Sequence, residues 1–198
     1  MKYDPVKHHR RSIRLRSYDY AQAGCYFVTV CTQNRACLLG RVQDRHMILN
    51  DAGAMVERYW RKIPEKFPSL ETEAWVVMPN HCHGIIAITS PPVGADPRVC
   101  PNSMPPADLS QSEHTGSPLS PISLGRVVQW FKTMTTNEYI RGVKQSTWPP
   151  FQKRLWQRNY YEHIVRDEHG CDRIRNYILQ NPALWDKDQL HPENPSKW

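Results

Sequence analysis

The segment 75–88 constrains the fold most strongly, because it consists of two apolar stretches interrupted by a Pro-Asn pair. The apolar and β-branched residues of both stretches predict two β-strands joined by a turn. His81 and His83 flank Cys82 near the start of the second stretch. Because side chains alternate between the faces of a strand, we expect both imidazoles on one face and Cys82 on the other. Two imidazoles on one face can share a metal ion.

Further strands and helices are predicted on both sides of this segment, and 24–42 is expected to form a hairpin. The order of the elements predicts an α+β sandwich, with a mainly antiparallel sheet and helices packed on it. The last helix has Asp167 as a candidate N-cap and ends before Pro182. The predicted strands are 24–32, 36–42, 70–78, 83–89 and the start of 155–165, and the predicted helices are about 50–66, 123–144 and 168–180.

A proline- and serine-rich stretch at about 90–121 has no periodic apolar content. Such a composition cannot bury enough surface to offset its ordering entropy, so we expect a disordered insert within the domain. The first 20 residues are rich in arginine and predict a basic arm that a phosphate backbone would order, or else a solubilising tail. The expected organisation is an arm at 1–20, one domain at 21–185 and a tail at 186–198.

The chain is basic, with a net charge of +7, seven Trp and nine Tyr. Positive charge together with many aromatic rings suits a polyanion whose bases can stack, although a merely basic protein is the alternative. Because phosphate contacts come mostly from Lys and Arg, basic residues are the candidates for DNA contacts. We select Arg10, Arg11, Arg14, Lys132 and Arg158.

Several classes of protein are disfavoured by composition. The mean hydropathy is −0.67, and no apolar run approaches the length of a membrane span. The basic N-terminus lacks the apolar region of a secretory signal, so we expect a cytoplasmic protein without membrane contact. None of the six cysteines forms a C-x-x-C pair, which argues against a zinc ribbon.

Three blocks of the sequence, in this order and spacing, resemble the signature blocks of the single-tyrosine HUH transposases. The HUH element is histidine, bulky apolar residue, histidine, here with Cys82 in the middle. The Tyr-x-x-x-Asn-Pro ending and the Trp-Gln-Arg block look most like the REP-associated tyrosine transposase branch. The resemblance covers roughly 20–90 and 122–185. The blocks lie at 75–83, 156–166 and 177–182.

This resemblance implies a ferredoxin-like α/β sandwich, the HUH endonuclease fold, and an enzyme that cleaves and rejoins single-stranded or hairpin DNA. His81 and His83 would hold a divalent metal, and Asn181 matches the position of a further ligand. Tyr177 matches the nucleophile, which would attack a backbone phosphate and leave a 5′-phosphotyrosine and a free 3′-OH. A covalent intermediate conserves the bond energy that rejoining needs.

Two considerations on the metal point in different directions. Imidazole suits zinc, copper, nickel or manganese, whereas the resemblance implies magnesium or manganese. Asn181 would add a hard oxygen ligand, and we therefore expect Mg²⁺ or Mn²⁺. Monomer and homodimer both stay open, because insertion-sequence members of the family dimerise while the REP-associated branch looks monomeric.

Other residues could compete with those selected. Tyr139, Tyr160 and Tyr161 are rival nucleophiles, but we expect their rings to pack or to stack on bases. His163 is expected in a helical or near-helical segment, with a structural hydrogen bond. A packed ring with a solvated hydroxyl is the alternative for Tyr177 itself.

Three classes of function are compatible with the sequence. The first is a metal-dependent single-strand DNA transposase or nickase. The second is a catalytically silent protein of the same fold that binds DNA hairpins. The third is a zinc-stabilised interaction module built on His81, Cys82 and His83, which is disfavoured because Cys82 should point away from the histidines.

Overall fold

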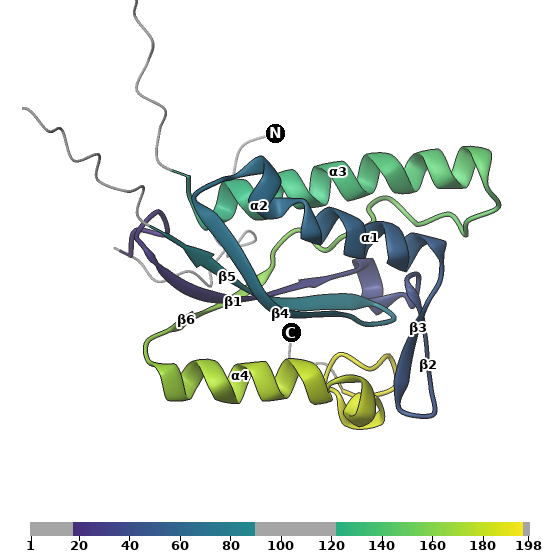
Figure 1. The fold of residues 1–198 in the computed structure, drawn as a ribbon. Helices are drawn as coiled ribbons and strands as arrows, with labels where there is room; N and C mark the ends of the chain where they lie inside the picture. Colours follow the sequence, from purple (N-terminus) through teal and green to yellow (C-terminus); the bar gives the residue numbers. More distant parts are fainter. Residues whose placement is uncertain (1–17, 90–121, 196–198) are drawn as a thin grey trace, which may run out of the picture.

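The computed structural model describes residues 18–89 and 122–195, and Figure 1 shows how their elements are arranged. Predictions for the remaining segments lie outside the described residues. These predictions concern Arg10, Arg11, Arg14 and the insert at about 90–121.

An antiparallel sheet of four strands, in the order β4-β5-β1-β6, forms the middle layer. Helices α1, α2 and α3 cover one face and α4 covers the other (Figure 1). The predicted α+β sandwich with a central antiparallel sheet is therefore confirmed. The strands are β1 (Gly24–Cys31), β4 (Leu70–Val77), β5 (His81–Ile88) and β6 (Tyr161–Val165).

The main hydrophobic core lies between the sheet and helices α1 (Asp51–Arg61) and α3 (Leu124–Gln145). Asn50 caps α1 by accepting a hydrogen bond from the amide of Gly53. The chain continues from α1 into the short helix α2 (Ile63–Lys66). Trp60 packs directly on β5 at Gly84, where a Cβ would stand 2.2 Å from the indole Cζ2. Only glycine leaves room for this ring, so the pair fixes how α1 lies on the strand that carries the histidines.

The opposite face of the sheet is covered by α4 (Glu168–Gln180), whose N-cap is Asp167 as predicted. A second, smaller apolar cluster joins them and includes Phe27 of β1 and Ile178 of α4. Arg175 of α4 also forms an ion pair of 2.6 Å with Glu73 of β4. These contacts hold the helix in a defined position across the sheet. The 3₁₀ helix η2 (Pro182–Lys187) follows.

The predicted hairpin of 24–42 is wrong. Residues 40–43 form β2 (Gly40–Gln43), which pairs with the unpredicted β3 (His46–Leu49) in a separate two-stranded sheet. Both edges of β1 are already occupied by β5 and β6, and the 3₁₀ turn η1 (Gln33–Arg35) directs the chain away from it.

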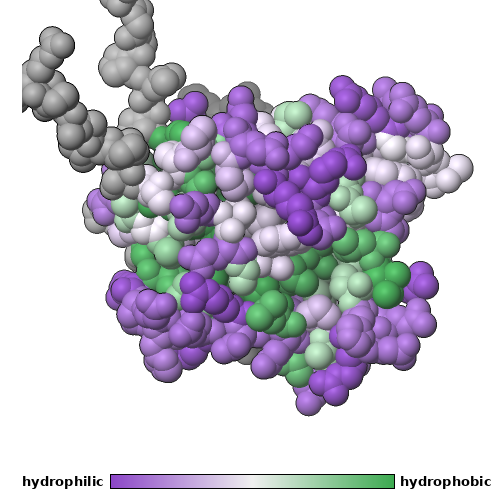
Figure 2. Space-filling view, viewed as in Figure 1, coloured by the Kyte–Doolittle hydropathy of each residue, from purple (hydrophilic) through white to green (hydrophobic). Residues whose placement is uncertain are grey.

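The expectation for His163 is also wrong, because this residue lies on β6 and pairs with Phe27 of β1. In the part of the chain that the structure describes, no helix is both long and apolar enough to cross a membrane. Figure 2 shows one face of the molecule, on which the apolar residues gather between the α1–α3 layer and α4.

Candidate active site

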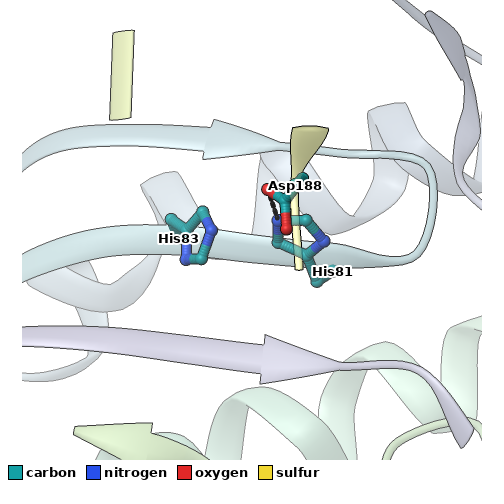
Figure 3. Close-up of side chains that lie close together, drawn as sticks. All are labelled: His81, His83 and Asp188. Atoms are coloured by element: carbon teal, nitrogen blue, oxygen red, sulfur yellow. Dashed lines mark ion pairs between the residues drawn. The ribbon is translucent and has the colours of Figure 1, made fainter. Parts of the chain in front are cut away.

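His81 and His83 project from β5 toward the face that α4 covers. Their ring centroids are 4.4 Å apart, and both side chains are buried. Figure 3 shows the two rings side by side with Asp188 next to His81. Cys82 is buried in the main core on the opposite face, as the alternation of strand side chains predicts. The thiol therefore cannot join the histidines in binding one ion.

Asn80 determines which nitrogen of His81 carries the hydrogen. The amide nitrogen of Asn80 donates to the carbonyls of Arg35 and Leu190, which leaves its Oδ1 as an acceptor. His81 Nδ1, 2.8 Å from that oxygen, must therefore be the donor. The lone pair of His81 is thus on Nε2, a buried atom without a hydrogen-bond partner among the described residues. An orphaned, oriented imidazole nitrogen of this kind is typical of a metal ligand.

His83 lies between a threonine and the tyrosine of α4. Its Nδ1 is 2.8 Å from Thr29 Oγ1, and its Nε2 is 3.3 Å from the Tyr177 hydroxyl. Burial lowers the pKa of His81 to about 3. Burial, and then the proximity of His81, lower the pKa of His83 well below its usual value. Both imidazoles are therefore neutral at physiological pH, the form that binds a metal.

Oxygen atoms that could bind a metal come from the end of α4 and from the segment after η2. Asp188 accepts hydrogen bonds from the Asn181 side-chain amide at 2.9 Å and from the Leu190 backbone at 2.6 Å. Asn181 Oδ1 is buried and has no hydrogen-bond partner in the described part of the chain. Ligand atoms of His81, His83 and Asp188 all lie within 4.8 Å of one another. Two imidazoles, a carboxylate and an unpaired amide oxygen fit a divalent cation.

Arg35 fixes the segment that carries Asp188. Its guanidinium donates to the backbone carbonyls of His191 and Asn194, each at 2.9 Å, and to that of Pro192 at 3.3 Å. Because one side chain binds several carbonyls of residues 189–194, this segment is held as a defined loop. We call 188–194 the Asp188 loop.

Tyr177 lies on α4 at the edge of this site, with 39% of its surface exposed. Burial, and then the Asp188 carboxylate, raise the pKa of its hydroxyl to about 12. The hydroxyl is therefore protonated at neutral pH, and action as a nucleophile would require loss of this proton. The structure brings Tyr177 together with His81, His83 and Asn181, although β5 and α4 are far apart in sequence.

A cleft of about 670 Å³ opens beside Tyr177 and His83. The rival tyrosines Tyr160 and Tyr161 line it, whereas Tyr139 is fully buried and donates to the carbonyl of Pro149. The other described residues of its lining are Phe27, Thr29, Cys31, Gln157, Asn159, Gln189 and Leu190.

Lys132 and Arg158 lie away from the histidines, around α3. The Lys132 ammonium donates to the carbonyls of Gln157 and Asn159, each at 2.9 Å, and lies 5.6 Å from the centre of the Tyr160 ring. Arg158 is exposed, and together with Lys132 it lines a cleft at the α3 surface. Lys132 thus supports the 157–160 segment of the chain.

Asp188, Asn80 and Thr29 belong to this site but were not among the predicted site residues. Asp188 falls in the segment read as a polar tail, where no spacing distinguishes it from the neighbouring Asp186. Asn80 directly precedes the histidine motif, and this adjacency was a usable signal. Thr29 meets His83 only because β1 and β5 pair in this register.

No protein-family model matches the sequence. An uncharacterized protein of Haemophilus influenzae is 38% identical over 193 residues, which cover 96% of this chain and 97% of the relative. The solved structure of a REP-associated tyrosine transposase bound to a REP hairpin aligns with a TM-score of 0.52 and 19% identity, covering 94% of this chain and 91% of that one. The chain therefore belongs to the family of the Haemophilus influenzae protein and has the fold of a REP-associated tyrosine transposase.

Proposed function

We propose that this protein is a metal-dependent tyrosine transposase, which cleaves and rejoins single-stranded or hairpin DNA with Tyr177 as the nucleophile. The observation that carries the proposal is the 3.3 Å separation between the Tyr177 hydroxyl and His83 Nε2. This contact places a tyrosine directly beside two neutral imidazoles, a buried carboxylate and an unpaired amide oxygen. The neighbouring fold, solved with a REP hairpin bound, supports DNA as the substrate class.

The chain's own residues suit an attack on a phosphodiester. The Tyr177 oxygen forms a bond to phosphorus while the bond from phosphorus to the 3′-oxygen breaks, which leaves a 5′-phosphotyrosine and a 3′-OH. The cleft beside Tyr177 opens to solvent, which can take up the proton that the tyrosine loses and supply the one that the departing 3′-oxygen gains. In the reverse step the 3′-OH attacks the phosphotyrosine, so the strand is rejoined without an external energy source.

His81, His83, Asp188 and the carbonyl of Asn181 are the residues that would hold the divalent ion. Such an ion would supply charge that neutralises and orients the phosphate. The Asp188 carboxylate and the amide oxygen are hard ligands, which favour Mg²⁺ or Mn²⁺, and Mn²⁺ is also compatible with imidazole. Manganese is therefore the first ion to test.

The direct test uses labelled hairpin DNA with single-stranded flanks, taken from the sequence around the gene, together with Mn²⁺ or Mg²⁺. Wild type should form an adduct with DNA that resists SDS. Tyr177→Phe should bind the same DNA but form no adduct. Tyr59→Phe is the control, because Tyr59 lies on α1, on the opposite face of the sheet from α4 (Figure 1), and should leave adduct formation intact.

Two results would overturn the proposal. One is an adduct that persists in Tyr177→Phe. The other is a wild-type protein that binds the hairpin but never cleaves it with either ion, which would establish the binding-only function instead.

A further inference from the structure

We infer that the cleft beside Tyr177 is a subsite for one unpaired nucleobase that flanks the cleaved phosphate, and that side-chain amides of the cleft read its edge. The inference rests on the proposed function and deepens it, because it assigns residues to the choice of cleavage site. Cleavage itself would need only the tyrosine and the metal-binding residues.

The position of the cleft carries the first step. His83 and Tyr177 belong both to the candidate active site and to the lining of the cleft. Whatever occupies the cleft is therefore adjacent to the phosphate that Tyr177 attacks. Its volume of about 670 Å³ lies within the range of small-molecule sites and can hold a nucleotide.

The chemistry of the lining favours a base over a phosphate. Among the described residues that line the cleft there is no Lys, Arg, Asp or Glu. A phosphate would call for cations, whereas a base needs an aromatic surface and polar groups at its edge. Phe27 supplies part of that surface, with its ring stacked on His83 at 5.2 Å and Tyr161 edge-on at 6.2 Å.

Three amide side chains, those of Gln157, Asn159 and Gln189, complete the lining. An amide offers a donor and an acceptor side by side, and such a pair can form two hydrogen bonds with one base. No hydrogen bond within the described part of the chain occupies these three side-chain amides. They are therefore available to a ligand.

The two walls of the cleft are held in place by the fold. One wall is held by Lys132 through the backbone carbonyls of Gln157 and Asn159. The backbone N–H of Gln157 also donates to the Cys31 carbonyl at 2.8 Å. The other wall belongs to the Asp188 loop, which Arg35 fixes. Polar groups positioned in advance of binding discriminate between ligands better than mobile ones.

The experiment separates base recognition from cleavage. Tyr177→Phe, which cannot form the adduct, is titrated with hairpin DNA in which each nucleotide near the cleavage site is replaced in turn by an abasic one. We expect one position where loss of the base weakens binding by about 5- to 100-fold, the effect of removing one stacked base. The same abasic substitution should cost less when Gln157→Ala and Asn159→Ala are added, because the hydrogen bonds to the base are then already lost and only the stacking on the aromatic wall remains.

Gln152→Ala is the matched control, since Gln152 is exposed in the same stretch and is outside the described lining. It should keep the abasic penalty. In the active enzyme, Gln157→Ala and Asn159→Ala should also relax the preference for the flanking base while adduct formation continues. Circular dichroism melts show whether each variant is folded.

Each failure has its own signature. The subsite is refuted, but not the transposase, if no abasic position weakens binding while the hairpin is still bound. It is equally refuted if the Gln157→Ala and Asn159→Ala variants keep the wild-type preference for the flanking base. If wild type forms no adduct but one abasic position strongly weakens DNA binding, the proposed transposase function is refuted. The protein would then be a DNA-binding protein that recognises the flanking base.

Discussion

The Asp188 carboxylate lies 3.9 Å from Nε2 of His81, and both side chains are almost fully buried. Burial keeps His81 uncharged, so this imidazole does not neutralise the carboxylate. A buried charge without a countercharge is unfavourable even when hydrogen bonds partly compensate it. A divalent cation between the two groups would remove this cost, which is why we place Asp188 among the metal-binding residues.

Asp188→Asn should weaken Mn²⁺ binding by at least about 10-fold, because the substitution removes the negative charge and keeps the shape. Isothermal titration calorimetry measures the affinity directly. Asp186→Asn is the control, since Asp186 is exposed on η2 and should bind the ion like wild type. Equal affinity in wild type and Asp188→Asn would exclude the carboxylate from the site.

Arg35→Gln should weaken Mn²⁺ binding by several-fold without abolishing it. The guanidinium holds the Asp188 loop through its carbonyls and contacts none of the metal-binding groups, so its loss makes the position of Asp188 less defined. Hydrogen exchange should rise in 189–194 while β5 remains protected. The exposed Arg45→Gln in the β2–β3 turn is the control. Unchanged exchange in the loop would contradict this role.

Acidification should destabilise the metal-free protein. The folded pKa of His81 is lowered from 6.5 to about 3, so below pH 6.5 the unfolded chain binds a proton that the folded chain does not. The stability that depends on neutral His81 is fully present above pH 6.5. As the pH falls toward 3, the free energy of unfolding decreases by up to about 1.4 kcal/mol per pH unit. Urea unfolding between about pH 7 and about pH 5 measures this slope. His81→Gln should reduce the slope without removing it, because His83 is buried too and its pKa is also lowered. An equal slope in both proteins would refute the assignment to His81.

Local sequence patterns predicted the elements that place the histidines and the tyrosine. The N-cap at Asp167 and the Asn181-Pro182 pair correctly predicted where α4 begins and ends. The alternation of strand side chains correctly predicted that both imidazoles lie on one face. These features depend on neighbours in the sequence, which is why they could be read without coordinates.

Long-range partners were not predictable in the same way. The partner of β2 depends on which edges of the sheet are already occupied, and the meeting of Asp188 with His81 depends on how Arg35 holds a loop distant in sequence. No local composition or periodicity carries that information. The Asp188 side of the site therefore became visible only in three dimensions.

Gly84→Ala should destabilise the fold by about 1–3 kcal/mol, because the new methyl group would overlap the Trp60 ring. Urea unfolding of the metal-free protein measures the loss. The control is a double-mutant cycle with Trp60→Phe, whose smaller ring leaves space for the methyl group. If the two substitutions were additive, the close packing of α1 on β5 would not be what requires glycine.

Lys132 and Arg158 were both selected as candidate DNA contacts, and the salt dependence of DNA binding can separate their roles. Arg158 is exposed, so Arg158→Gln should lower the slope of log affinity against log salt by about 0.7, the value for one contact with single-stranded DNA. Lys132 instead holds the carbonyls of Gln157 and Asn159. Lys132→Gln should therefore leave the slope nearly unchanged and reduce the abasic penalty at the flanking base. If Lys132→Gln instead lowered the salt slope and left the abasic penalty unchanged, Lys132 would be a phosphate contact. Its hydrogen bonds to the Gln157 and Asn159 carbonyls would then not be what holds the cleft wall in place.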